Sequence, residues 1–210
     1  MSLTFPDAAA RLVRIGQRFD TRGWVSGTSG NFSVVLDEEP LRLAITRSGT
    51  HKGELTIGDI LEVGDEGSSI GTAVGTPSAE TRLHVAIVHA RPAAAVLHTH
   101  SIWSTQLSDR LSTRGGVAIQ GYEMLKGLSG VTTHEHREWI PILENDQDMV
   151  RLAERVTATL HERPDCHAFL LKRHGLYTWG ATVPEAVRHV EIVEFLLESV
   201  GRKEASPWRS

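Results

Sequence analysis

Short apolar runs alternate with amphipathic segments along nearly the whole of this 210-residue chain. Apolar runs of about four to eight residues are typical of buried strands, whereas apolar residues at three- to four-residue spacing are typical of helices packed against a sheet. We therefore predict an α/β fold formed by a single domain over residues 1–210. Strand direction in its sheet should be mixed, because segments joined by hairpins and segments joined by crossover helices both occur.

The pattern also places the individual elements. Asp7 is suited to cap the first helix and Pro184 to begin the last one. Helices are predicted at 7–22, 78–90, 101–111, 146–161 and 184–200. Strands are predicted at 32–36, 41–46, 60–63, 70–74, 93–98, 117–119, 139–143, 168–171 and 176–179.

Composition excludes several classes of function. The net charge is −4, so the chain lacks the basic field that neutralises nucleic acid or holds an anionic membrane. Cys166 is the single cysteine and cannot form an intrachain disulfide. The sequence shows neither a secretory signal pattern nor an apolar run of membrane-spanning length. We expect a cytoplasmic protein with neither nucleic acid nor membrane as a partner.

The triplet His98-Thr99-His100 is the clearest candidate for chemistry. On a strand, residues two apart point to one face about 6.5 Å apart, so both imidazoles can reach one cation. The triplet also follows an apolar run, and sites of α/β proteins gather where strands end. A third ligand is needed, and His174 is the best candidate because Gly175 after it permits close backbone approach. The alternative is that all three are structural histidines at strand ends and turns.

A second pair with the same spacing, His134 and His136, lies in a polar stretch rich in charges. A solvated loop accounts for this pair better than a metal site does. The remaining histidines have no second ligand at useful spacing, so we interpret them as structural or exposed; they are His51, His84, His89, His161, His167 and His189.

Two loops of small residues flank the first predicted hairpin, at 27–31 and 46–52. Free backbone amides and hydroxyls in such loops can surround a phosphate, with Lys52 or Arg47 supplying positive charge. Neither loop has the P-loop pattern, and ordinary turns remain the alternative because Gly and Ser are common in loops.

Two carboxylates are candidate acid/base groups. Glu80 stands at the start of the second predicted helix, and Glu123 lies among Tyr122, Met124 and Leu125. An apolar surround can tune a carboxylate for proton transfer near a metal. For each of them a solvated surface position is the alternative, which spacing alone does not exclude.

In order and spacing, these motifs resemble the class II aldolase/adducin family over about residues 7–200. The loops 27–33 and 45–49 resemble the family's two phosphate-side loops, and 77–80 its Pro-Ser-Ser-Glu segment. The triplet 98–100 resembles its metal pair, and 173–175 the segment of its third ligand. The resemblance implies a three-layer α/β/α sandwich around a mixed, largely antiparallel sheet. It also implies a C4 homotetramer with sites at subunit interfaces.

The resemblance assigns roles to particular residues. It implies one Zn²⁺ per subunit, held by His98, His100 and His174. It implies acid/base roles for Glu123 and Glu80, with Glu123 favoured because some family members carry Cys at the position of Glu80. Substrate and phosphate binding is implied for Gly30, Asn31, Ser48, Gly49, Lys52 and Ser78. Ala79 departs from the family serine, which leaves Ser78 as the hydroxyl of that loop.

Segments 120–127 and 172–180 resemble dehydratase members of the family rather than aldolases. The implied activity is zinc-dependent dehydration of 5-methylthioribulose 1-phosphate to 5-methylthio-2,3-dioxopentyl phosphate in methionine salvage, through a metal-stabilised enediolate. The alternatives are an aldolase or epimerase acting on another sugar phosphate, and a non-catalytic binding protein like adducin. A binding protein would be expected to have a broken set of ligands, whereas here all three histidines and both carboxylates are present.

Overall fold

The structure is a computed structural model that describes residues 3–71 and 74–205. Its helices are α1 (Phe5–Thr21), α2 (Thr81–Ala90), α3 (Ile102–Arg110), α4 (Met149–Glu162) and α5 (Val183–Ala205). Its strands are β1 (Asn31–Glu38), β2 (Leu41–Thr46), β3 (Ile60–Gly64), β4 (Ala95–Thr99), β5 (Gly116–Ile119), β6 (Glu138–Leu143), β7 (Ala168–Leu171) and β8 (Gly175–Gly180). Across the described ranges, no helix is both long and apolar enough to cross a membrane.

Within the described residues, eight strands form one sheet in the order β3-β2-β1-β4-β8-β7-β6-β5. Neighbouring strands run antiparallel except β6 and β7, which run parallel. The mixed, largely antiparallel sheet predicted above is therefore confirmed. β4 lies between β1 and β8 in the middle of the sheet, and its residues are buried throughout.

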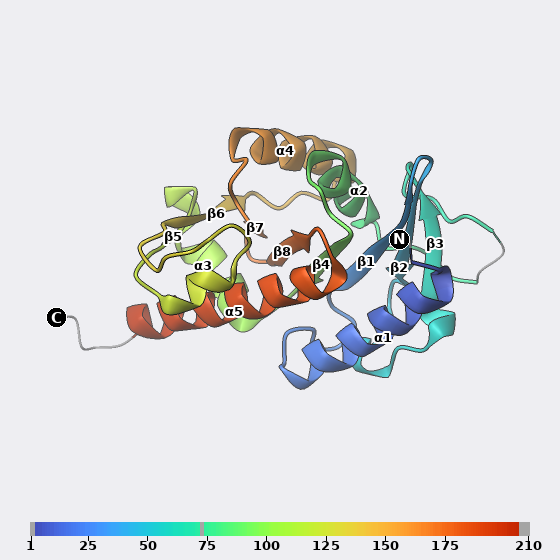
Figure 1. The fold of residues 1–210 in the computed structure, drawn as a ribbon, viewed down its shortest axis with the longest axis horizontal. Helices are drawn as coiled ribbons and strands as arrows, with labels where there is room; N and C mark the ends of the chain where they lie inside the picture. Colours follow the sequence, from blue (N-terminus) through green and yellow to red (C-terminus); the bar gives the residue numbers. More distant parts are fainter. Residues whose placement is uncertain (1–2, 72–73, 206–210) are drawn as a thin grey trace.

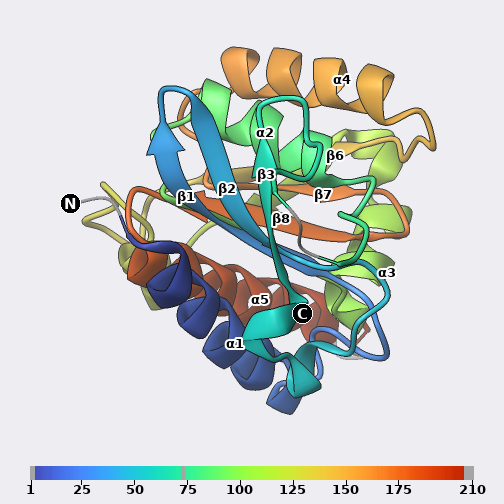
Figure 2. The ribbon, with the colours of Figure 1, turned by 90° about the vertical axis from the view of Figure 1, so that its right-hand side faces the viewer.

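Helices cover both faces of the sheet, so the molecule has three layers (Figure 1). Viewed along the sheet, α2 and α4 lie above it and α1 and α5 below it (Figure 2). Helix α3 shares an apolar cluster with α5, which includes Leu107 from α3 and Leu196 from α5. The three-layer arrangement expected from the sequence is confirmed.

Helix α1 illustrates how local sequence produces this packing. The Thr4 side chain accepts a hydrogen bond from the Asp7 amide and caps the helix, and Pro6 fits in the first turn where no amide partner is needed. Leu12, Ile15 and Phe19 then fall on one face and are buried against the sheet.

The substitution Leu12→Ala tests the contribution of this face. We expect it to lower the free energy of unfolding by about 2–5 kcal/mol, because Leu12 is fully buried and its removal leaves a cavity. Urea denaturation measures the change, and Arg14→Ala on the exposed face should change stability by less than about 0.5 kcal/mol. Equal effects of the two substitutions would contradict the packing described for α1.

The predicted strand at 70–74 is wrong for its described residues, and residues 72–73 lie outside the described ranges. The segment after the 64–67 turn makes one isolated bridge, between Val63 and Ser69. Gly71 follows with φ of 83°, a backbone conformation outside the strand region. Val74 is 85% exposed, so apolar composition there does not reflect burial.

Strand pairing brings distant candidate residues to one edge of the sheet. Asn31 at the start of β1 pairs with His98 near the end of β4, and His98 pairs with Tyr177 of β8. Because β4 runs antiparallel to both neighbours, its last residues lie beside the first residues of β1 and β8. The 27–31 loop and His174, which precede those strands, therefore meet the His98-Thr99-His100 triplet.

Candidate metal centre and adjoining pocket

Three histidines converge at this edge. His98 and His100 come from the end of β4, and His174 from the turn between β7 and β8. The Nε2 of His98 lies 2.7 Å from the Nε2 of His100 and 3.4 Å from the Nε2 of His174. Each ring offers a nitrogen within 4.8 Å of the others, so the group predicted from the sequence can hold a metal ion.

The hydrogen bonds of the cluster are compatible with a bound cation. The Nδ1 of buried His98 lies 2.9 Å from the Leu176 carbonyl oxygen, to which it donates. In a neutral ring this leaves a lone pair on Nε2, which faces the other two Nε2 atoms. A metal ion placed between the rings could accept this lone pair together with those of the other two Nε2 atoms. Tautomer control by a backbone carbonyl is also the usual arrangement behind a metal-binding histidine.

The surroundings keep His98 and His100 neutral. Burial lowers the pKa of His98 well below its ordinary value; the negative charge of Glu80 opposes this shift, and neighbouring His100 and His174 add to it. Burial, and then the proximity of His174, lowers the pKa of His100 to about 4. Metal binding requires deprotonated imidazole, so this environment favours the ligating form at neutral pH.

Close backbone approach at Gly175 positions His174. A Cβ on Gly175 would lie 2.1 Å from the Thr99 carbonyl oxygen, so only glycine allows β8 to begin this close to β4. The preceding Arg173 adopts a left-handed φ of 56°, and its side chain pairs with Asp109 of α3 at 2.7 Å. Thr105 adds a hydrogen bond to the His174 carbonyl oxygen at 3.0 Å. The ligand-bearing turn is thus fixed from α3 as well as from β4.

Glu80 lies directly against the cluster. It precedes α2, and its Oε1 is 3.1 Å from the His174 Nε2 while its Oε2 accepts from Asn31 Nδ2 at 2.5 Å. Burial favours the neutral carboxyl, but nearby His98 and His174 and the hydrogen bonds from His174 and Asn31 outweigh it, so the pKa of Glu80 is held well below its usual range. Glu80 is therefore a carboxylate at neutral pH.

A small polar pocket adjoins His100 and Glu80. It has a volume of about 120 Å³, and its lining contains no apolar side chain. The six residues predicted to bind substrate and phosphate all line it: Gly30, Asn31, Ser48, Gly49, Lys52 and Ser78. The structure thus gathers at one point three loops that are far apart in the sequence.

Lys52 is the buried cation of this pocket. It is 1% exposed, and its ammonium donates to the carbonyl oxygens of Thr28 at 3.0 Å and Thr50 at 2.7 Å. Burial lowers its pKa to about 8, although the negative charge of Glu80 acts in the opposite direction. Its hydrogen bonds link the two small-residue loops, and its charge lies where an anion would enter.

Two residues of this region were not singled out by the sequence analysis. The Ser29 hydroxyl is buried, has no hydrogen-bond partner among the described residues, and belongs to a pocket-lining residue. His84, interpreted above as structural, contacts the Asn31 Oδ1 at 2.5 Å and the Ser33 Oγ at 2.7 Å, and so holds the Asn31 amide toward Glu80. Ser29 could have been predicted, because it lies in the 27–31 loop of small residues. Nothing in the sequence position of His84 indicated a contact with Asn31.

Glu123 is not brought to this pocket within one chain. It begins a short 3₁₀ helix (Glu123–Gly127), its side chain is 70% exposed, and its carboxylate pairs with Lys126. The hydrogen bond from Lys126 lowers the pKa of Glu123. The apolar surround expected from Tyr122, Met124 and Leu125 does not enclose the carboxylate.

The second histidine pair divides between surface and core. His134 is exposed, whereas His136 donates to buried Glu138 at 2.8 Å. Glu138 also accepts from the His167 amide at 3.1 Å and lies 3.0 Å from the His167 Nδ1. One buried carboxylate therefore contacts both His136 and His167.

This network makes stability depend on pH. Burial opposes the charge on His167, but Glu138 outweighs it and raises the pKa of His167 above 6.5; Glu138 is also buried, yet its hydrogen bonds from His167 and His136 lower its pKa below 4.5. The pair therefore stabilises the fold fully between about pH 4.5 and pH 6.5, the ordinary pKa values of Glu138 and His167. The stabilisation is lost as pH rises through the folded pKa of His167. Glu138→Gln should destabilise the protein by about 1–3 kcal/mol near pH 6 and by less at about pH 8.5.

Urea denaturation at the two pH values measures this difference, with Glu154→Gln on the exposed face of α4 as the matched control. A destabilisation by Glu138→Gln that stays constant or grows with pH would contradict the pairing.

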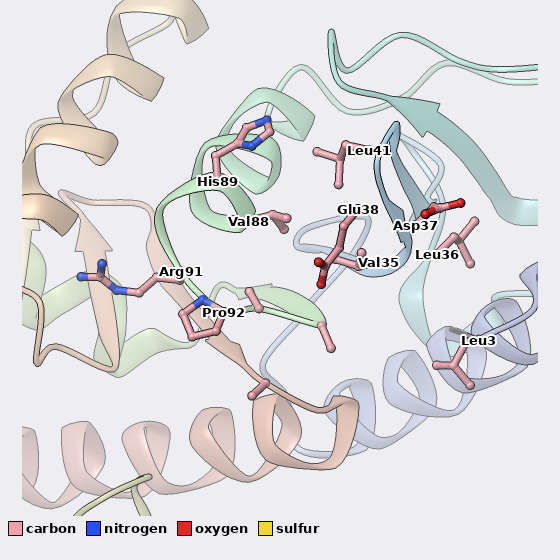
Figure 3. A pocket seen from close by; sticks show the side chains of 13 residues that line it. Leu3, Val35, Leu36, Asp37, Glu38, Leu41, Val88, His89, Arg91 and Pro92 are labelled. Carbon is pink, nitrogen blue, oxygen red and sulfur yellow. The ribbon is translucent and has the colours of Figure 1, made fainter. Parts of the chain in front are cut away.

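A larger cavity, of about 750 Å³, lies at the opposite end of β4 (Figure 3). Val35, Leu41, Val88 and Pro92 are among its lining residues. Two of its polar side chains already have partners: His89 contacts Asp65 at 2.5 Å, and Arg91 donates to the Leu160 carbonyl oxygen at 2.5 Å. Among residues 3–71 and 74–205, no cluster of metal-ligating side chains like that of the three histidines lies at this cavity, which makes the smaller polar pocket the better candidate site.

Comparison with known proteins agrees with this fold and site. The model of the class II aldolase and adducin N-terminal domain matches residues 10–200. A three-layer sandwich with three converging histidines beside a polar pocket defines a protein of the class II aldolase type, a family whose enzymes are typically metal-dependent. The chain belongs to the class II aldolase and adducin family.

Two relatives have one name in common. A methylthioribulose-1-phosphate dehydratase of Sorangium cellulosum is 42% identical over 93% of this chain and 92% of its own length. The protein of that name from Methylococcus capsulatus is 46% identical over 92% and 93%. Among solved structures, L-fuculose-1-phosphate aldolase from Thermus thermophilus has a TM-score of 0.74 at 23% identity, covering 96% of this chain and 97% of its own, a likeness of fold.

Proposed function

We propose that this protein dehydrates 5-methylthioribulose 1-phosphate to 5-methylthio-2,3-dioxopentyl phosphate, and so acts as a hydro-lyase of methionine salvage. The observation that carries the proposal is the identity of 42–46% to proteins named methylthioribulose-1-phosphate dehydratase, over about nine-tenths of both chains. The three histidines, the adjoining carboxylate and the polar pocket supply the kinds of groups that the reaction needs.

The metal is proposed to be zinc, one ion per subunit, held by His98, His100 and His174. Three histidines are a common ligand set for a catalytic zinc, although imidazole also suits other divalent ions. When bound, the ion would supply a Lewis acid that polarises substrate oxygens. The low pKa values of His98 and His100 support this assignment, because protons do not compete for these nitrogens at neutral pH.

The polar pocket is proposed to bind the phosphate end of the substrate. Gly30, Asn31, Ser48, Gly49, Lys52 and Ser78 surround it. Gly30 has a φ of 74° and a Cβ there would lie 2.7 Å from the His98 carbonyl oxygen, so glycine is required for the first loop to reach the triplet. The Lys52 ammonium and the free Ser29 hydroxyl add a charge and a donor, as anion binding requires.

Dehydration begins with two proton transfers, one from carbon 3 and one to the hydroxyl that leaves carbon 4 as water. The enol that results then tautomerises to the 2,3-diketone, with loss of the proton of the carbon 3 hydroxyl and addition of a proton to carbon 4. Glu80 is ionised and lies against His174, which suits it to accept a proton or to orient a substrate hydroxyl. Asn31, held by His84, keeps the carboxylate aimed at the cluster. A group that donates a proton to the leaving hydroxyl is still required.

Glu123 is proposed to be that second acid/base group, contributed by a neighbouring subunit of a homotetramer. Two observations support assembly. The carboxylate is 70% exposed and lies outside the pocket of its own chain. No apolar side chain lines the pocket of about 120 Å³, so it suits a phosphate but leaves the methylthio end of the substrate without apolar side-chain contacts. A neighbouring copy that presents Glu123 and Met124 would supply the second acid/base group and an apolar contact for the methylthio end.

Steady-state kinetics tests the substrate. The kcat/KM for 5-methylthioribulose 1-phosphate should exceed that for L-fuculose 1-phosphate by at least about 100-fold. Only the first substrate carries an apolar methylthio end, and its dehydration breaks a carbon–oxygen bond whereas the aldolase reaction breaks a carbon–carbon bond. A preference for fuculose 1-phosphate, with release of two carbonyl fragments, would assign the site to an aldolase and overturn the proposal.

A further inference from the structure

A buried carboxylate lies behind the histidine cluster and takes no part in the proposed reaction. Glu194 is on α5, is 2% exposed, and its Oε1 accepts a hydrogen bond from the Thr99 hydroxyl at 2.5 Å. The nearby Ser101 hydroxyl acts to lower the pKa of Glu194. One side chain of α5 therefore binds Thr99 and adjoins Ser101, the two residues that flank His100.

These two partners define the path of the chain through His100. Thr99 is the last residue of β4, and Ser101 caps α3 by accepting from the Ser104 amide at 3.0 Å. The His100 amide between them donates to the Trp24 carbonyl oxygen at 2.7 Å. Since side chains alternate along a strand, Thr99 faces α5 while His98 faces the other side of the sheet, where it stacks on Tyr177.

Packing alone does not account for an acidic residue here. The second oxygen of Glu194 is buried without a hydrogen-bond partner, and no basic side chain within the described residues forms an ion pair with it. Burial raises the pKa of Glu194 to about 7. Such a group costs stability relative to an apolar side chain of similar size, so its benefit must lie in what it positions.

We propose that Glu194 is a positioning residue for the metal centre, which fixes the β4-to-α3 turn so that the Nε2 of His100 meets those of His98 and His174. The inference rests on the proposed metal site. It predicts that removing the carboxylate separates two properties that a purely structural residue would change together: metal affinity falls, while stability of the metal-free protein does not.

The experiment compares zinc affinity, measured by chelator competition, with the Tm of the metal-free protein. Glu194→Leu should weaken zinc binding by about 10- to 100-fold, the usual effect of losing a group that orients a metal ligand. The Tm should stay the same or rise. Glu194→Gln keeps an acceptor for Thr99 and should retain affinity within about threefold. Glu198→Gln, one turn further along α5 on a more exposed side chain, is the matched control and should leave affinity unchanged.

Thr99→Val removes the same hydrogen bond from the Thr99 side with little change in shape, and it should also weaken zinc binding. This variant provides the test if Glu194→Leu does not fold. Zinc affinity within twofold of wild type in both variants, or a fall in Tm with unchanged affinity, would overturn the positioning role. A wild-type chain that binds no zinc would overturn the metal site itself. Because no substrate is used, the result is independent of which sugar phosphate the enzyme dehydrates.

Discussion

His98→Ala is expected to leave the protein folded but without bound zinc and without measurable dehydration. His98 is the fully buried member of the cluster, and its Nε2 contacts the Nε2 atoms of both other histidines. Its loss leaves two ligands where a catalytic zinc needs three from the protein. We expect zinc affinity to fall by more than about 100-fold, beyond the effect of losing an orienting group alone. Metal content after gel filtration measures this directly.

His134→Ala is the matched control for metal content. His134 belongs to a second pair with the same spacing, yet it is exposed and lies outside the cluster. It should leave zinc stoichiometry unchanged. Full zinc loading of His98→Ala, or equal loss in both variants, would contradict the ligand set described here.

Glu123→Gln is expected to retain zinc and to lower turnover by about 10²- to 10⁴-fold, the range for loss of a general acid or base. The substitution keeps the shape of the side chain and removes its ability to exchange a proton. Because Glu123 is 70% exposed, stability should change little. The measurements are kcat, zinc content and Tm of the variant beside wild type. Undiminished kcat would reject the role of Glu123.

Mixing subunits tests whether Glu123 acts across an interface. His98→Ala chains keep Glu123, and Glu123→Gln chains keep the histidines. A site is intact only at an interface where a Glu123→Gln chain supplies the histidines and a His98→Ala chain supplies Glu123; the reverse interface lacks both groups. In a random cyclic tetramer, about one quarter of the sites would combine both intact groups. Co-refolded mixtures should therefore regain up to about one quarter of wild-type activity. Mixed tetramers that remain inactive would show that Glu123 does not act from a neighbouring copy.

The metal cluster could be predicted from the sequence because its geometry is mostly local. His98 and His100 need only the alternation of a strand to share a face, and His174 needs a turn followed by glycine. The antiparallel order of β1, β4 and β8 then brings the 27–31 loop to the same edge. The family resemblance supplied that long-range order, since spacing alone does not specify which strands pair.

Other features depend on tertiary contacts that no local pattern records. Sequence spacing does not distinguish Glu80 from Glu123 as an acid/base candidate. The fold does, because it encloses Glu80 against His174 and leaves Glu123 at the surface. Glu194 resembled an ordinary helix residue, yet α5 buries it under Thr99. The apolar residues near Val74 indicated a strand, but in the described part of this segment Gly71 has a φ outside the strand region and Val74 is exposed.

The measurement that tests the account most directly is mass spectrometry of the products formed when zinc-loaded protein meets 5-methylthioribulose 1-phosphate, beside a chelated sample and one restored with zinc. We predict a product lighter by one water, absent after chelation and recovered on adding zinc. Cleavage into two smaller carbonyl fragments, or water loss that persists without metal, would contradict a metal-dependent dehydratase built on His98, His100 and His174.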